Sequence, residues 1–177
     1  MEEITYRRLS KAETARLGEI DRSEHWDSTY HMRGHALVLE PEPVDLRGWP
    51  PGYLEKEGVL QPRLFDRGGV VYGAFFGDRL VGYMSLDTKP ICGMHDRLLL
   101  DMLHVDRSFR DRGVGCKLLE HAKSIAREMG ARSLYVCAIP SQRTVEFYMH
   151  RGFVPAEELD PEQLAEWPDD IHMVLKL

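Results

Sequence analysis

The sequence predicts an α/β (α+β) protein with a mixed, mostly antiparallel twisted sheet, one parallel strand–helix–strand crossover and helices on both faces. Three observations support this fold class. Residues 70–86 form two apolar runs joined by Gly-Asp, which is typical of an antiparallel hairpin. The apolar run 98–105, bounded by charged residues, suits a buried strand. Apolar residues then recur at helical spacing over 114–129 before another strand at 133–139, and this order predicts the crossover.

The first third of the chain is less regular. Residues 4–9 alternate well enough for a short strand, and Ser10 with Glu13 forms a capping box that opens a helix through about residue 21. Five prolines punctuate residues 22–62, so we expect loops there with one or two short helices, most clearly at 51–59.

Capping residues place the remaining elements. Gly130 ends the helix that begins at residue 114, and Ser141 caps a helix that reaches about residue 150. A strand begins at Phe153, and residues 171–177 close the sheet. The acidic run between residues 157 and 170 is interpreted as a solvated loop.

Length and composition limit the classes of protein. The 177 residues, 43% hydrophobic and 29% charged, predict a single domain over 1–177 with a sizeable core. No apolar run approaches the roughly 18 residues of a membrane span, and no signal sequence is evident. Three widely spaced cysteines favour a reducing compartment, so we expect a cytoplasmic protein. A net charge of −6 argues against nucleic-acid binding.

A basic, glycine-containing loop lies between the 98–105 strand and the next helix. Unpaired N–H groups at a helix N-terminus suit a phosphate, and Gly113 and Gly115 permit close approach to the backbone. Arg110, Arg112 and Lys117 add positive charge. The spacing is neither that of a P-loop nor that of the dinucleotide fingerprint. The alternative interpretation is a plain strand-to-helix turn.

Two segments resemble signatures of the GNAT N-acetyltransferases. Residues 103–115, LHVDRSFRDRGVG, are similar to the acetyl-CoA signature of that family. Residues 144–153, TVEFYMHRGF, resemble its second signature, a helix with Phe-Tyr followed by Gly-Phe. The resemblance covers roughly 68–154. It implies the GNAT fold, an acetyl-CoA-binding core at 98–130 and a variable substrate-side segment at 22–62.

The resemblance also implies a reaction, in which an acetyl group passes from acetyl-CoA to a primary amine by direct attack in a ternary complex. Leu103 and Val105 would offer backbone groups to the pantetheine arm, where their strand separates from its neighbour. Tyr148 would act as general acid on the leaving thiolate, and a phenol with a pKa of about 10 suits a thiol with a pKa of about 8.5. The alternative for Tyr148 is a packed aromatic beside Phe147.

Thirteen residues are expected to contact acetyl-CoA. Ser141 stands where many family members carry an Asn that holds the pantetheine, and its side chain reaches less far. The full set is Leu103, His104, Val105, Arg110, Asp111, Arg112, Gly113, Val114, Gly115, Cys116, Ser141, Thr144 and Phe147.

Something must deprotonate the acceptor, because only about one alkylamine in a thousand is neutral at pH 7. Asp101 is the one carboxylate in the 98–105 run and is the candidate base or amine anchor; the alternative is a structural buried Asp. Strict alternation along the strand would point His104 away from the reacting centre.

The acceptor pocket is assigned to the variable segment, where Glu24, Trp26 and Tyr30 are the candidates. For the aromatic residues of this segment, the alternative interpretation is that they belong to the core or to a lid. His31 and His35 are four residues apart, but no third ligand is evident, so no metal is expected.

The expected partner is a small-molecule or peptide amine, with no nucleic acid and no membrane. The acidic surplus favours a cationic acceptor, and the resemblance makes a homodimer a candidate. The alternative function is a non-catalytic acyl-CoA-binding regulatory domain of the same fold.

Overall fold

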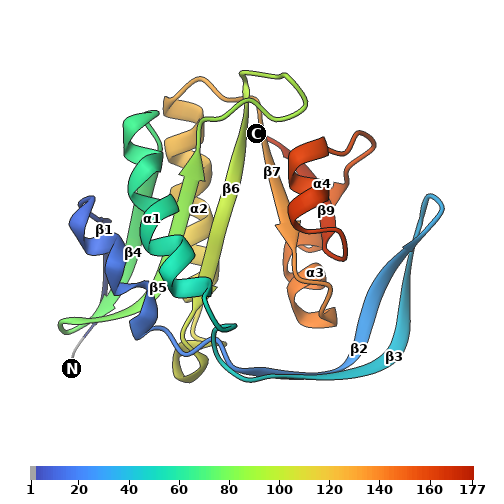
Figure 1. Cartoon of the computed structure of the whole chain (residues 1–177), viewed down its shortest axis with the longest axis horizontal. Helices are drawn as coiled ribbons and strands as arrows, with labels where there is room; N and C mark the ends of the chain where they lie inside the picture. Colours follow the sequence, from blue (N-terminus) through green and yellow to red (C-terminus); the bar gives the residue numbers. More distant parts are fainter. Residues whose placement is uncertain (1–2) are drawn as a thin grey trace.

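The computed structural model describes residues 3–177 and contains a seven-stranded sheet with the order β1-β4-β5-β6-β7-β9-β8 (Figure 1). A separate two-stranded sheet is formed by β2 and β3. The strands of the large sheet are β1 (Ile4–Arg8), β4 (Val70–Phe76), β5 (Arg79–Asp87), β6 (Arg97–Val105), β7 (Ser133–Ala138), β8 (Val154–Pro155) and β9 (Ile171–Lys176). Every neighbouring pair is antiparallel except β6 and β7, which confirms the predicted mixed sheet.

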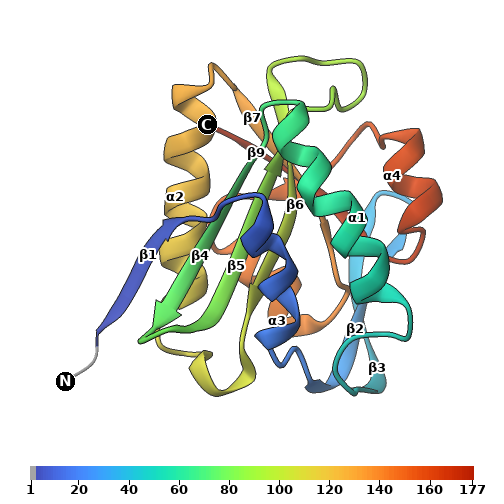
Figure 2. The same cartoon turned by 60° about the vertical axis from the view of Figure 1, so that its left-hand side comes forward.

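Helices cover both faces of this sheet, as predicted (Figure 2). On one face lies α2 (Val114–Glu128), whose buried stripe includes Leu118, Leu119 and Ala122. The opposite face carries the 3₁₀ helix η1 (Ala12–Glu19) and α1 (Tyr53–Asp66). The remaining helices are η2 (Arg107–Phe109), α3 (Gln142–Met149) and α4 (Pro161–Glu166).

The parallel pair β6–β7 is short, and the two strands separate after three residues. Arg97–Leu99 pair with Ser133–Tyr135, and no further pairing joins the strands toward their C-terminal ends. The separation is visible in Figure 1, where β6 and β7 diverge toward α3. It leaves an opening in the middle of the sheet.

A β-bulge at Asp101 changes which side chains of β6 face which side. Ser85 pairs with Met102, but the next residue of β5, Leu86, pairs with Leu100, so Asp101 is the extra residue. An extra residue interrupts the alternation of a strand. His104 therefore lies on the α1 side of the sheet, against Trp49. The expectation that His104 points away is wrong for this reason.

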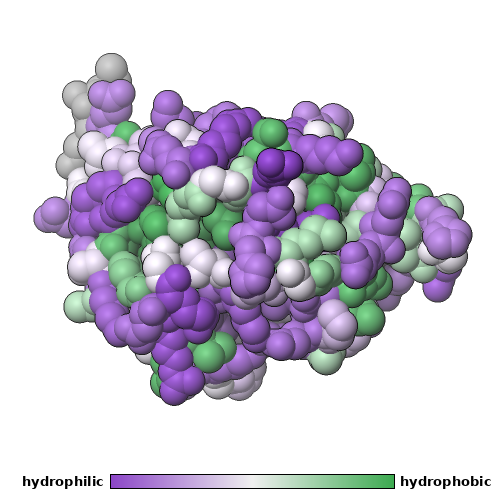
Figure 3. Space-filling view, turned by 90° about the horizontal axis from the view of Figure 1, so that it is seen from above, coloured by the Kyte–Doolittle hydropathy of each residue, from purple (hydrophilic) through white to green (hydrophobic). Residues whose placement is uncertain are grey.

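The segment 22–62 is more regular than the sequence predicts. Instead of loops, β2 (Glu24–Arg33) and β3 (Ala36–Leu46) form a long hairpin with a register shift near Trp26, followed by α1 (Tyr53–Asp66). Prolines are tolerated in β3 because its other edge has no strand partner in the described chain. Figure 3 shows this hairpin reaching beyond the body of the molecule, with hydrophilic and hydrophobic residues interspersed over the visible face.

The acidic run near the C-terminus is also more ordered than expected. The carboxylate of Asp160 accepts hydrogen bonds from the N–H groups of Glu162 and Gln163, both at 3.1 Å, and so begins α4. The same carboxylate accepts the N–H of Cys92 at 2.8 Å. Asp160 is buried and Asp170 is half-buried, so the interpretation of a solvated loop is wrong at both positions.

No helix within residues 3–177 is long and apolar enough to cross a membrane.

Candidate active site

A cavity of about 820 Å³ passes through the opening between β6 and β7. One end lies at the N-terminus of α2, where Gly113, Val114 and Gly115 line it, and the other is bounded by the starts of β2 and α1 and by the chain around Trp167. It therefore connects the predicted phosphate loop with the substrate-side segment.

At the loop end, three backbone N–H groups precede the first hydrogen bond of α2. That bond runs from the N–H of Lys117 to the carbonyl of Gly113 at 3.0 Å, so the N–H groups of residues 114–116 have no partner within the helix. The first turn holds no acidic residue to neutralise the helix dipole. Gly113 has a φ of 77°, which strains any residue with a Cβ. The loop can therefore hold an anion.

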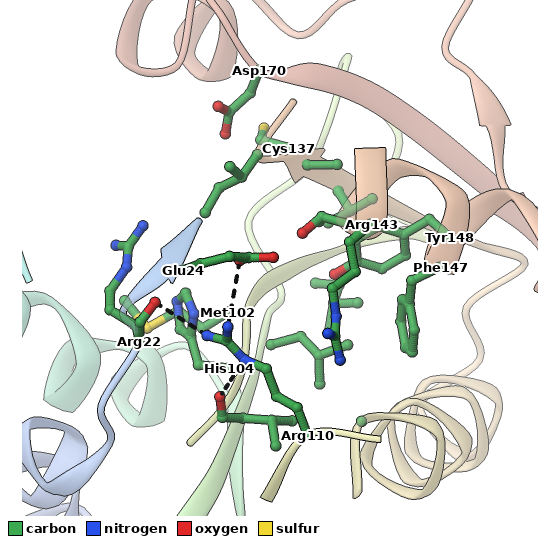
Figure 4. A pocket seen from close by; sticks show the side chains of 18 of the residues that line it. Arg22, Glu24, Met102, His104, Arg110, Cys137, Arg143, Phe147, Tyr148 and Asp170 are labelled. Carbon is green, nitrogen blue, oxygen red and sulfur yellow. Dashed lines mark hydrogen bonds and ion pairs between the residues drawn. The ribbon is translucent and has the colours of Figure 1, made fainter. Parts of the chain in front are cut away.

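The two arginines of the loop have different surroundings. Arg110 donates to the carbonyl oxygens of Arg22 and Ser23, both at 3.1 Å, and of Val105 at 3.3 Å. Figure 4 shows its guanidinium between Arg22 and Glu24. The side chain of Arg110 thus attaches the start of β2 to the end of β6. Arg112 is exposed, lies 5.1 Å over the ring of Phe109 and does not line the cavity.

Tyr148 lies in α3, beside the opening between the strands. Its ring is 4% exposed and packs edge-on against Phe147 at 5.2 Å and Phe153 at 5.0 Å, so it is a packed aromatic and also a cavity residue. Within residues 3–177 its hydroxyl has no hydrogen-bond partner. Burial raises the pKa of Tyr148 above its usual value, so the phenol stays protonated at neutral pH.

The other residues of the second signature divide between the cavity and the core. Thr144 and Phe147 line the cavity. Ser141 is fully buried outside it: its Oγ accepts the N–H of Thr144 at 3.2 Å and donates to Oγ1 of Thr144 at 2.9 Å, and so caps α3. Tyr30 also lies outside the lining, and its hydroxyl is 3.4 Å from a carboxylate oxygen of Glu146.

Asp101 lies in the cavity on the α1 side of the sheet. Its Oδ2 accepts hydrogen bonds from Nε2 of Gln61 at 2.7 Å and from Oγ of Ser85 at 3.1 Å. The side chain is accessible through the cavity but surrounded by protein, and the resulting desolvation raises its pKa, partly opposed by these two hydrogen bonds. Oδ1 accepts no hydrogen bond within the described chain and is free to receive one from a ligand.

His104 shares this side of the cavity and is held by an aromatic contact. The imidazole meets the ring of Trp49 edge-on at 4.9 Å. Burial, together with the positive charges of Arg22 and Arg110, lowers the pKa of His104 to about 3. The ring is therefore neutral at physiological pH.

Several lining residues could not be selected from the sequence. Glu24 and Trp26 line the cavity, as expected for the substrate-side segment. Arg22 and Tyr53 belong to the same segment but carry no signal that selects them, and Cys137, Trp167 and Asp170 come from other parts of the chain. Burial raises the pKa of Asp170 to about 6. Its position between α4 and β9 carries no sequence signal beyond its place in the acidic run.

The described residues include no group of three or more His, Cys, Asp and Glu side chains arranged to hold a metal. His31 lies on a strand rather than on a helix, and its Nε2 is 2.7 Å from a carboxylate oxygen of Glu42.

Comparisons with known proteins bear on the fold and the family of the chain. An uncharacterised N-acetyltransferase of Schizosaccharomyces pombe is 30% identical over 113 residues, which are 61% of this chain and 78% of the relative. The solved structure of a nourseothricin acetyltransferase has a TM-score of 0.73 at 18% identity and covers 98% of both chains. A putative streptothricin acetyltransferase of Bacillus anthracis, solved with acetyl-CoA, has a TM-score of 0.70 at 20% identity and covers 99% of both.

The model of the acetyltransferase (GNAT) family matches residues 26–153, which include the loop at the start of α2 and the helix that carries Tyr148. The chain therefore belongs to the GNAT family of acetyltransferases.

Proposed function

We propose that the protein transfers the acetyl group of acetyl-CoA to a primary amine by direct attack in a ternary complex. The observation that carries the proposal is the continuous cavity, which has an anion-binding helix N-terminus at one end and the carboxylates Asp101 and Asp170 at the other. The two reactants can approach from opposite sides of the opening between β6 and β7. Acetyl-CoA bound to a GNAT neighbour supports this choice of donor.

At the donor end, the backbone of residues 113–116 would hold the pyrophosphate and the separated edge of β6 would face the pantetheine. The edge of β6 from Leu100 to Val105 has no partner on the β7 side, so its peptide groups are available to an extended amide-bearing ligand. Leu103 and Val105 are the residues of that edge that we expect to bind it.

At the acceptor end, Asp101 would anchor the ammonium group or accept its proton. A raised pKa brings a carboxylate nearer to the value at which it can accept a proton at neutral pH. Gln61 and Ser85 occupy one oxygen of Asp101 and would fix the direction of the other. Glu24 and Trp26 would contact the rest of the acceptor.

Tyr148 would complete the reaction as general acid. The amine nitrogen attacks the thioester carbonyl carbon, the C–S bond breaks, and the phenol of Tyr148 gives its proton to the departing thiolate. The phenolate then recovers a proton from solvent, while the proton of the amine leaves through Asp101. The raised pKa of Tyr148 favours the protonated form that this role needs.

Thiol release from acetyl-CoA over a panel of amines tests the proposal, with wild type compared with Tyr148→Phe. General acid catalysis contributes about 100-fold or more, so kcat should fall by that factor while the Kd of acetyl-CoA, measured by calorimetry, stays unchanged. Tyr72→Phe is the matched control, because Tyr72 stacks on His121 outside the cavity. Unchanged turnover in Tyr148→Phe would refute the acid role.

The same experiment separates the enzyme from a non-catalytic acyl-CoA-binding domain. A regulatory domain would bind acetyl-CoA and release no thiol with any amine. A protein that fails to bind acetyl-CoA at all would contradict both functions.

A further inference from the structure

Arg22 brings a guanidinium to the cavity without an ion-pair partner among the described residues. Its guanidinium carbon lies 5.0 Å from the ring centre of Trp49 and 5.8 Å from that of Tyr53, and the side chain lines the cavity. Within residues 3–177 it makes no hydrogen bond through its guanidinium and no ion pair within 4.0 Å. A guanidinium stacked on aromatic faces keeps its in-plane N–H groups free for a carboxylate.

The local structure holds Arg22 at this place by its backbone and by the rings beneath it. Its carbonyl oxygen accepts a hydrogen bond from Arg110 at 3.1 Å. The indole N–H of Trp49 donates to the carbonyl of Ile20 at 2.8 Å, which fixes the ring on which the guanidinium rests. Apart from its contacts with the rings of Trp49 and Tyr53, the guanidinium makes no hydrogen bond within the described chain, so its N–H groups remain available to a ligand in the cavity.

Asp170 supplies the opposite charge without pairing with Arg22. Its carboxylate accepts no hydrogen bond within the described chain, yet Arg22 is near enough to lower its pKa against the larger effect of burial. In Figure 4 both side chains lie on one side of the cavity, and Phe147 and Tyr148 lie on the other. Two opposite charges that face one cavity more than 4.0 Å apart leave room for a ligand that bears both complementary charges.

We propose that the acceptor is a zwitterion, an amine that also bears a carboxylate, with the carboxylate bound by Arg22 and the amine directed to Asp101 and Asp170. The inference rests on the proposed function and names its substrate class. A partly buried, unpaired charge is costly, and a ligand carboxylate would offset that cost at Arg22. The same cation would repel polyamines and other purely cationic amines, which the acidic composition alone favours.

Matched pairs of amines test this inference. The panel contains α-amino acids and ω-amino acids of increasing length, each compared with its own carboxamide in the thiol-release assay. A bidentate, charge-assisted contact between Arg22 and the ligand carboxylate predicts that kcat/KM for the best amino acid exceeds that for its carboxamide by about 10- to 100-fold, mostly through KM. Arg22→Gln should bring this ratio close to 1, chiefly by raising KM for the amino acid.

Two further variants separate bidentate recognition by the guanidinium from a general effect of positive charge. Arg22→Lys keeps the positive charge and loses the bidentate donor geometry, so its acid-to-carboxamide ratio of kcat/KM should be intermediate. Arg47→Gln removes a cation whose side chain is 89% exposed and which does not line the cavity, and it should keep the wild-type ratio. Equal kcat/KM for acids and carboxamides in the wild type, or an unchanged ratio in Arg22→Gln, would overturn the inference.

A binding measurement keeps the inference testable if the proposed function fails. Should no amine release thiol, the same acids and carboxamides are titrated calorimetrically into the protein in the presence of CoA. Tighter binding of the acids by wild type than by Arg22→Gln would support the carboxylate site without catalysis. No difference between the two proteins would refute it.

Discussion

Replacing Arg110 tests whether its side chain joins the acetyl-CoA side of the cavity, at the end of β6, to the acceptor side, at the start of β2. Its guanidinium donates to three carbonyl oxygens, and the carboxylate of Glu24 lies 3.8 Å away. The side chain is 17% exposed, so these contacts are largely shielded from solvent. Arg110→Met keeps the aliphatic stem and removes all three donors.

The expected loss of stability follows from these contacts. Hydrogen bonds from a charged donor contribute roughly 1.5–3 kcal/mol each, and ordering an Arg side chain costs about 2 kcal/mol. Partial solvation of the freed carbonyl groups reduces the difference further, so we expect a net loss of about 2–3 kcal/mol. For a chain of this size that corresponds to a fall in Tm of about 4–12 °C.

Thermal unfolding of the ligand-free protein measures this effect, and Arg112→Met is the matched control. Arg112 lies over the ring of Phe109 but is exposed, so its replacement should shift Tm by no more than about 2 °C. In Arg110→Met the KM of the acceptor should also rise, because Arg22 loses its backbone anchor. Equal Tm values for the two variants would refute the reasoning.

Two further predictions concern the anion-binding loop at the start of α2 (residues 113–116) and the dependence of stability on pH. Gly113→Ala should weaken acetyl-CoA binding about tenfold in calorimetry, since φ is 77° there, whereas Gly34→Ala, at a φ of 64° in the β2–β3 turn, should carry similar strain and leave the Kd unchanged; equal Kd values in both would contradict the loop assignment. The pKa of Asp170 rises from 3.8 to about 6 on folding, so the folded state binds more protons than the unfolded state between these values and wild type loses about 3 kcal/mol as pH rises through that window. Asp170→Asn should therefore stabilise the protein in urea unfolding at pH 7.5 and have little effect at pH 4; an equal gain at both would show that charge burial is not the cause.

The central elements could be predicted because their signals are local. The helical spacing of α2, the Gly-Asp turn between β4 and β5, and the cap at Ser141 each depend on a few adjacent residues. The position of the β-bulge could not be predicted. The run 98–105 is apolar on both faces, so nothing in it shows that Asp101 is the extra residue or that His104 turns toward α1.

The acceptor side depends on contacts between distant parts of the chain. Arg22, Tyr53 and Asp170 meet around one cavity although almost 150 residues separate the first from the last. Nothing in the local sequence distinguishes Asp170 from the exposed acids near it. Likewise, Arg110 belongs to a motif that suggests phosphate binding. Only the folded chain shows that its side chain donates hydrogen bonds to the carbonyl oxygens of residues 22 and 23.

The β2–β3 hairpin is a separate sheet with few attachments to the rest of the molecule. Thr29 bridges to Ser141, the N–H of Tyr30 donates to the carbonyl of Pro140 at 2.7 Å, and Arg110 holds the chain just before β2. Substitutions at positions of 24–46 that make no such contact should therefore leave the seven-stranded ladder unaltered, whereas Glu24, 3.8 Å from Arg110, is coupled to the loop before α2. The outer part of the hairpin can therefore change in length and sequence during evolution while the central sheet and the helix N-terminus of α2 are inherited intact.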